Sequence, residues 1–194
     1  MAMLNDRIDL LERSFRHIAS TRMAGVPVLH AALQVRAVGF AALPDEPGWL
    51  CGVLVTPWFM NLLRLPLEPL VDPTAAAAAG CLDVGRDAPR VVFPSGGGQP
   101  LHFVGAQEDR LGHYEQCSLY SPMFHFADQA AAVATAAEVM KLLRNPPRAD
   151  DPARAPTSPP SAPPPATRPP DAEEPRPARR GFLFGRGAPA PSPR

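Results

Sequence analysis

The sequence predicts an α+β fold: one domain with an antiparallel β-sheet covered by an N-terminal and a C-terminal helix, followed by a disordered proline-rich tail. Apolar residues recur at helical spacing near both ends of residues 1–145, and short β-forming runs separated by turn signals lie between them. Helices that flank a run of hairpins are typical of an antiparallel sheet with one face covered by helices. We therefore expect both helices on the same face.

The first predicted element is an amphipathic helix that ends near Thr21, with Asn5 or Asp6 as its N-cap. It rests on one apolar stripe at alternating spacings of four and three residues, formed by Leu4, Ile8, Leu11, Phe15 and Ile18.

Two strands are expected next, at residues 33–40 and 49–56, because both runs are rich in β-forming residues. Residues 43–48 contain two prolines, an aspartate and a glycine, and this composition predicts the turn of an antiparallel pair. The second strand is apolar on both faces, which indicates a central position in the sheet. Residues 61–65 can form a third strand that ends at Pro66.

The remaining elements are a short helix, a meander of strands and a long final helix. Residues 72–80 predict the short helix, with Pro73 near its start. The meander is expected at residues 90–94, 101–105 and 112–119. The final helix begins at Ser121-Pro122 or near Asp128, and its apolar stripe is Phe126, Ala130, Val133, Ala137 and Met140.

Composition excludes several classes of protein. The 194 residues carry 19 Lys+Arg against 19 Asp+Glu and contain no basic block, so nothing predicts a nucleic-acid partner. No apolar run is long enough for an integral membrane segment, and charged residues interrupt the first twenty positions. Three cysteines are a sparse, odd set for a disulfide scaffold. We expect a cytoplasmic protein with free thiols.

Proline content divides the chain after residue 145. Residues 1–145 contain 11 of the 27 prolines and are long enough for one domain, whereas residues 146–194 contain the other 16. Residues 146–178 include no Leu, Ile, Val, Phe or Met, so we expect a disordered linker there. Residues 179–194 form a tail in which apolar residues return.

Two clusters of large apolar residues occur where turns or junctions are expected. Trp58, Phe59 and Met60 follow Pro57 at the end of a strand, and Met123 and Phe124 lie in a strand-to-helix junction. Packing on one side of a turn does not hide three consecutive large side chains, so we expect part of this surface to be exposed for client binding. The alternative is that these side chains only close the end of the domain.

The cysteines allow two further interpretations. Cys51, His113 and Cys117 could serve a metal or iron-ligand carrier, but no CxxC, HxxxH or CxxxC pair is present, which favours buried thiols and no metal site. Cys117 is a possible thiol site for a cysteine-dependent maturation enzyme, but no base or oxyanion hole accompanies it at a recognisable spacing. We therefore predict no catalytic residues and no cofactor.

The tail carries a short motif of its own, with two arginines followed by large apolar residues: Arg179, Arg180, Phe182, Leu183 and Phe184. The arrangement is similar to the core of a twin-arginine export signal, but no apolar region follows it, so it cannot export this chain. A solvated basic tail is one interpretation, and a docking motif is the other.

Taken together, several segments resemble the [NiFe]-hydrogenase assembly chaperones labelled HybE or HupJ. The segments that carry this resemblance are residues 56–62, 94–96, 117–124, 126–130 and 179–186. Some members of that family carry a fused rubredoxin module, but this chain lacks its CxxC pairs, so no metal is implied here.

The resemblance implies an accessory chaperone that acts in the maturation of an uptake [NiFe]-hydrogenase and has no enzyme activity. Its implied partner is a precursor of the small or large hydrogenase subunit, or its twin-arginine signal peptide, and other hydrogenase accessory proteins are further candidates. We hypothesise that the tail motif imitates the client's peptide and competes with it.

Overall fold

The computed structural model of the protein describes residues 2–94 and 98–146. Its elements follow in the order α1 (Ala2–Ser20), β1 (Arg36–Leu43), β2 (Glu46–Val55), β3 (Met60–Pro66), α2 (Pro73–Ala78), β4 (Asp87–Arg90), β5 (Leu101–Glu108), β6 (Gly112–Tyr120) and α3 (Gln129–Arg144). The strands form one antiparallel sheet in the order β1-β2-β3-β6-β5-β4. The predicted α+β class with N-terminal and C-terminal helices is confirmed.

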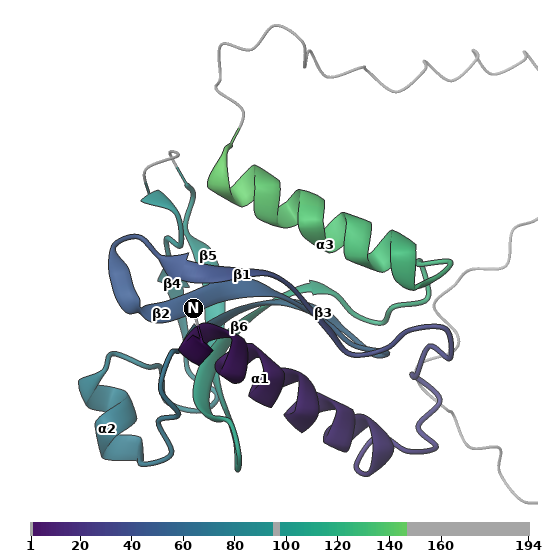
Figure 1. Ribbon diagram of the computed structural model, residues 1–194, viewed down its shortest axis with the longest axis horizontal. Coiled ribbons are helices and arrows are strands. Elements are labelled where there is room, and N and C mark those ends of the chain that lie inside the picture. The colour runs from purple at the N-terminus through teal and green to yellow at the C-terminus, as the bar shows by residue number, and fades with distance from the viewer. Residues whose placement is uncertain (1, 95–97, 147–194) are drawn as a thin grey trace, which may run out of the picture. The chain divides into compact units, whose positions relative to one another are not determined.

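The two long helices pack on opposite faces of the sheet, with α3 above and α1 below it in Figure 1. Leu50 and Leu54 of β2 belong to the core beneath α1, whereas Cys51 and Val53 belong to the core beneath α3. Successive side chains of a strand point to opposite faces. The expectation that both helices share one face is therefore wrong, because β2 is apolar on both sides and each side needs a cover.

The beginning of the fold follows the sequence prediction closely, with shifts at the element ends. α1 begins at Ala2, so Asn5 and Asp6 lie inside the helix and neither is the N-cap. β1 begins at Arg36, later than expected, although Leu33 and Val35 before it are buried.

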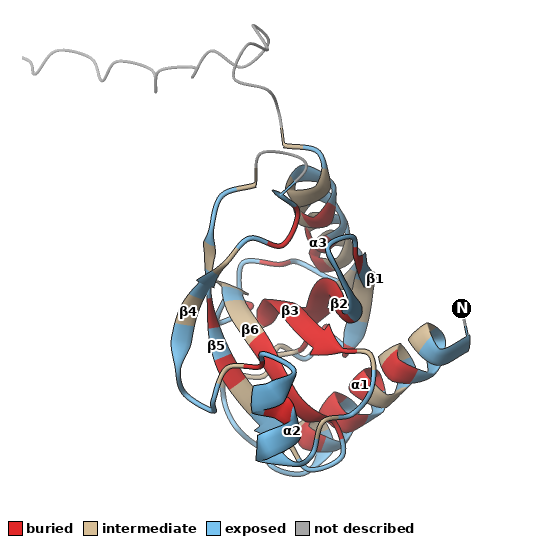
Figure 2. Ribbon diagram, turned by 90° about the vertical axis from the view of Figure 1, so that its left-hand side faces the viewer, coloured by how far each residue is buried: buried red, intermediate tan, exposed pale blue. Residues whose placement is uncertain are grey.

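In the second half of the domain, β4 is the strand whose position differs most from the prediction. This strand comprises Asp87–Arg90 and not residues 90–94, because the chain leaves the sheet after Arg90. Val92 and Phe93, which made the later segment look like a strand, instead insert into the core beneath α3. Figure 2 shows the exposed short strand β4 at the edge of the sheet.

The remaining elements are confirmed, but the predicted stripe of the last helix is wrong: Ala130 and Ala137 are exposed, and the buried residues of α3 are Ala132, Ala136 and Met140. Two helices have clear N-caps. Asp72 accepts a hydrogen bond from the Ala75 amide at the start of α2, and Asp128 caps α3 in the same way. Asp128, and not Ser121, therefore marks the start of the last helix. Among the described residues, no helix is both long and apolar enough to span a bilayer.

A buried ion cluster crosses the centre of the sheet. Arg64 of β3 faces Glu115 of β6, pairs with it, and lies 2.5 Å from the Glu46 carboxylate. Arg90 donates to the two Glu115 oxygens at 2.7 and 3.2 Å. The Glu115 side chain has no exposed surface, so these donors supply the compensation that a buried carboxylate needs.

The small size of Gly105 allows a main-chain amide to reach the Glu115 carboxylate. The main chain at Leu82 and Asp83 lies over Gly105 of β5, and the Leu82 amide donates to Glu115 at 3.1 Å. A Cβ atom at Gly105 would lie 2.2 Å from the Asp83 carbonyl oxygen, which is too close for any other residue. The ion cluster therefore links four strands to the connection that precedes β4.

We expect Glu115→Ala to lower the free energy of unfolding by about 3–5 kcal/mol, because the change leaves Arg64 buried without its main carboxylate partner. Urea unfolding followed by circular dichroism measures this loss. The control is Glu138→Ala, which removes an exposed pair with Lys141 and costs less than about 1 kcal/mol. Equal losses for the two variants would contradict the role given to Glu115.

Candidate functional site

Three connections meet at one end of the sheet, where α1 ends and α3 begins (Figure 1). They are the β2–β3 turn, the segment between α1 and β1, and the segment between β6 and α3. The His30 amide donates to the Pro57 carbonyl at 2.8 Å, and the Gln34 amide donates to the Gln129 side chain at 2.8 Å. These bonds hold the three connections together, although they lie far apart in the sequence.

The β2–β3 turn is held by Thr56, which lies fully buried at the end of β2. Its amide donates to the Phe59 carbonyl at 2.8 Å, and its hydroxyl accepts from the Phe59 amide at 2.9 Å. Pro57 restricts the backbone between them. The turn therefore presents Trp58 and Phe59 in fixed positions.

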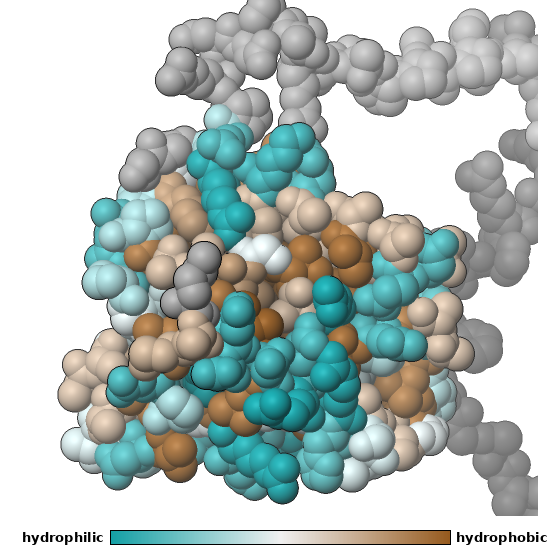
Figure 3. Space-filling model, in the orientation of Figure 1, coloured by the Kyte–Doolittle hydropathy of each residue, from teal (hydrophilic) through white to brown (hydrophobic). Residues whose placement is uncertain are grey.

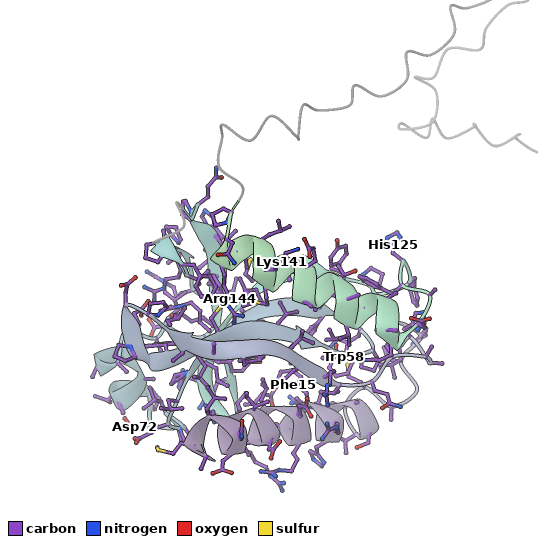
Figure 4. The ribbon with its side chains drawn as sticks, turned by 45° about the horizontal axis from the view of Figure 1, so that its top comes forward. Phe15, Trp58, Asp72, His125, Lys141 and Arg144 are labelled. Carbon is purple, nitrogen blue, oxygen red and sulfur yellow. The ribbon has the colours of Figure 1, made fainter. Side chains whose placement is uncertain are left out.

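The aromatic residues of the turn pack against α1. The ring centroids of Phe59 and Phe15 lie 5.8 Å apart, and those of Trp58 and Phe59 lie 5.4 Å apart, both in edge-to-face arrangements. Figure 4 shows Phe15 on α1 beneath Trp58, with Asp72 at the opposite end of the sheet. Trp58 and Phe59 are half-buried, so each retains some exposed surface at the sheet end.

The structure corrects two of the predicted client-binding residues. Met60 and Met123 are both 0% exposed, so the expectation that their side chains form part of the surface is wrong. Met60 is the first residue of β3, and both methionines join the core beneath α3. In contrast, Phe124 is 57% exposed, and its ring centroid lies 6.4 Å from that of His30.

An apolar pocket of about 420 Å³ adjoins the turn. It lies between the last turn of α1 and the segment before β1, and it is lined by Arg16, Ala19, Ser20, Leu29, His30, Ala31, Leu33, Gln34, Val35 and Pro57. We call this pocket together with Trp58, Phe59 and Phe124 the sheet-end surface. The sequence did not indicate that residues 29–35 line a pocket, because residues 33–35 were expected as the start of a strand and residues 29–32 were assigned to no element.

The main charged side chains beside this pocket already have partners within the protein. Arg16 pairs with Glu12, and the other carboxylate oxygen of Glu12 accepts from the Ala37 amide at 2.8 Å. Figure 3 shows mostly hydrophilic residues over α1 and apolar residues gathered over α3. The pocket therefore suits the apolar side chains of another polypeptide.

The surroundings of the three cysteines disfavour the thiolate form. Burial raises the pKa of Cys51 to about 12 and that of Cys81 to about 11. Burial also raises the pKa of the half-buried Cys117. A thiol with a raised pKa stays protonated and is a poor nucleophile.

The proposed carrier ligands are not brought together. In residues 2–94 and 98–146, no group of three His, Cys, Asp or Glu side chains could hold a metal ion. Cys51 and Cys117 line the core beneath α3, and His113 is buried at 5% exposure. The linker at residues 147–178 and the tail motif at residues 179–186 lie outside the described residues, and their roles remain predictions.

Comparison with known proteins gives close relatives of the chain. Protein HoxT of Cupriavidus necator is 42% identical over 185 residues, which cover 93% of this chain and 89% of HoxT. The hydrogenase expression/formation protein HupJ of Bradyrhizobium diazoefficiens is 37% identical over 146 residues, which cover 75% of this chain and 76% of HupJ.

A solved structure has the same fold. The solution structure of HybE from Escherichia coli matches with a TM-score of 0.51 and 20% identity, covering 94% of this chain and 91% of that one. The family model described as "[NiFe]-hydrogenase assembly, chaperone, HybE" matches residues 6–185, a span that includes both the described domain and most of the tail motif. The chain therefore belongs to the HybE family of [NiFe]-hydrogenase assembly chaperones.

Proposed function

We propose that the chain binds an immature [NiFe]-hydrogenase subunit, or its twin-arginine signal peptide, before export, and that it does so at the sheet-end surface. The observation that carries this proposal is the apolar pocket of about 420 Å³ next to the exposed ring of Phe124. Clusters of exposed apolar side chains on a soluble domain are typical of protein-binding sites. Family membership supports this class of client, and the apolar pocket supports the sheet-end surface as the binding site.

The rigid frame of this surface supports such a role. Thr56 and Pro57 fix the β2–β3 turn, and the bond from His30 to the Pro57 carbonyl fixes the neighbouring segment. A preformed apolar surface loses little conformational entropy when a partner binds. An unfolded or partly folded client can therefore be held through its apolar residues without a large rearrangement of the chaperone.

Binding without chemistry is sufficient for this function. The pocket itself brings together mostly apolar residues, and Arg16 within it is paired with Glu12. The raised pKa values of the cysteines also argue against a thiol nucleophile. We infer that the protein is not an enzyme and that it acts in the cytoplasm, where a precursor is assembled before twin-arginine export.

A charge placed in the pocket tests the proposal. We expect Ala31→Glu to weaken binding of a hydrogenase precursor at least about tenfold, because a carboxylate would be buried against apolar client residues. Ala32→Glu is the matched control, because Ala32 is also exposed but does not line the pocket. Co-purification and titration with each precursor subunit measure the effect. Equal binding by the two variants would reject the sheet-end surface as the client site.

The thiols give a test of the non-enzymatic interpretation. We expect Cys51 and Cys81 to react with iodoacetamide at pH 8 about a hundredfold more slowly in the folded protein than in urea, because burial removes both access and thiolate. Mass spectrometry of timed samples identifies each alkylated residue. A rapidly reacting Cys117 would instead favour the cysteine-dependent enzyme.

The competition hypothesis for the tail motif gives a separate prediction. If the motif at Arg179–Phe184 imitates the client's peptide, removal of residues 146–194 raises the affinity for a precursor peptide, because a tethered competitor has an effective concentration of about millimolar. Isothermal titration of the full and shortened chains measures this change. Unchanged affinity would discard competition and leave the sheet-end proposal intact.

A further inference from the structure

His30 is a titratable side chain within the mostly apolar sheet-end pocket. Its ring is half-buried, and the ring centroid lies 6.4 Å from that of the exposed Phe124. Its main-chain amide donates to the Pro57 carbonyl at 2.8 Å, which fixes the backbone beside the β2–β3 turn. The imidazole therefore borders both the pocket and the exposed aromatic ring that the proposed function uses.

A hydrogen bond at Nδ1 of His30 defines where the ring carries its proton. The Ala32 amide donates to Nδ1 at 3.3 Å. A main-chain amide is always a donor, so Nδ1 is the acceptor and holds no proton. The neutral imidazole then has its one proton on Nε2, and a second proton can bind only at Nδ1. Protonation of His30 therefore breaks the bond to Ala32.

The pocket offers no counter-charge to a protonated His30. No carboxylate lines it among the residues that the structure describes, and the charged residue that does line it is Arg16 of α1. Glu12 pairs with Arg16, and its other oxygen already accepts from the Ala37 amide. A proton on His30 would thus place a second cation in the pocket beside the first.

The other titratable groups of the surrounding elements lie outside this pocket. Near the end of α1, His17 and Arg22 line a different pocket beside the β5–β6 turn, and Arg22 has its own ion pair there. In the β6–α3 connection, His125 is exposed, and the Asp128 carboxylate is engaged as the N-cap of α3. The β2–β3 turn at residues 56–59 contains no ionisable side chain.

We propose that the sheet-end surface is proton-sensitive: it holds its client while His30 is neutral and releases the client when His30 gains a proton at Nδ1. Two effects act in the same direction. Loss of the Ala32 bond loosens the turn at residues 30–32, part of which lines the pocket. The new charge must also be desolvated beneath apolar residues of the client, which is costly.

The sign of the pH dependence follows from this preference for the neutral ring. Client affinity is complete at the alkaline end of the range and falls as the pH decreases, because the free protein then binds a proton that the complex excludes. Histidine is the side chain that ordinarily changes its charge between pH 5 and pH 8. The inference rests on the proposed function for the client and adds a control of its release.

His30→Asn separates the proton from the hydrogen bond. The asparagine Oδ1 can accept from the amide two residues later, as Nδ1 does, but it does not gain a proton in this range. His125→Asn is the matched control, because it removes an exposed histidine from the turn before α3 (Figure 4). The probe is the purified hydrogenase precursor subunit that binds the full chain more tightly at pH 7.5. Calorimetric titration at pH 7.5 and pH 5.5 gives the affinities.

Between pH 7.5 and pH 5.5, we expect the affinity of the unchanged chain to fall at least about threefold more than that of His30→Asn. The comparison removes any titration of the precursor itself. His125→Asn should behave as the unchanged chain does, and thermal unfolding at both pH values verifies that each chain is folded. Equal falls in the unchanged chain and His30→Asn would overturn the inference, and so would a fall that disappears in His125→Asn.

The Ala32 amide gives a second measurement, which needs neither a client nor a variant. In an NMR titration of the full chain, the Ala32 amide and the His30 ring should shift with the same midpoint, because the proton at Nδ1 breaks the bond between them. An Ala32 amide that does not follow the His30 ring would overturn the inference.

Failure of this inference and failure of the proposed function give different results. Equal precursor binding by Ala31→Glu and Ala32→Glu at pH 7.5 would reject the sheet-end surface as the client site, and proton-linked release with it. Weaker binding by Ala31→Glu at pH 7.5, combined with equal affinity of the unchanged chain at both pH values, would reject only the role of His30.

Discussion

Burial of the sheet on both faces is the constraint on which the rest of this structure depends. All residues of β3 are buried, because α1 covers one face and the core beneath α3 covers the other. Polar side chains in this strand must therefore find partners inside the protein. Arg64 pairs with Glu115, and the side-chain Nδ2 of Asn61 donates to the side-chain Oε1 of Gln116 at 3.0 Å. These pairs join β3 to β6, the strand on which the second half of the domain is built.

The same arrangement leaves few main-chain hydrogen-bonding groups at the sheet edges with which a partner strand could pair. The outer edge of β1 is occupied by the helices, since the Ala37 amide donates to Glu12 of α1 and the Gly39 carbonyl accepts from Arg144 of α3. At the opposite edge, β4 is short and contains Pro89, which has no amide hydrogen. Addition of a partner strand is thus disfavoured at both edges. This is consistent with the proposal that recognition uses the connections at the sheet end.

The chemistry of the sheet-end pocket determines what kind of contact a partner can make there. The sheet-end pocket is mostly apolar, and its Arg16 is paired internally. An apolar surface alone binds many unfolded chains, whereas charge complementarity adds selectivity.

Local patterns in the sequence determined the order and type of nearly every element, because apolar periodicity, proline positions and the turn residues act over a few neighbours. They also identified the β2–β3 turn and Phe124 as candidates for an exposed surface. Three features depended on tertiary packing: the opposite placement of α1 and α3, the burial of Met60 and Met123, and the meeting of residues 29–35 with Pro57. A strand that is apolar on both sides does not reveal which helix covers which side. That choice, and every pocket between distant segments, is set by long-range contacts that no local pattern contains.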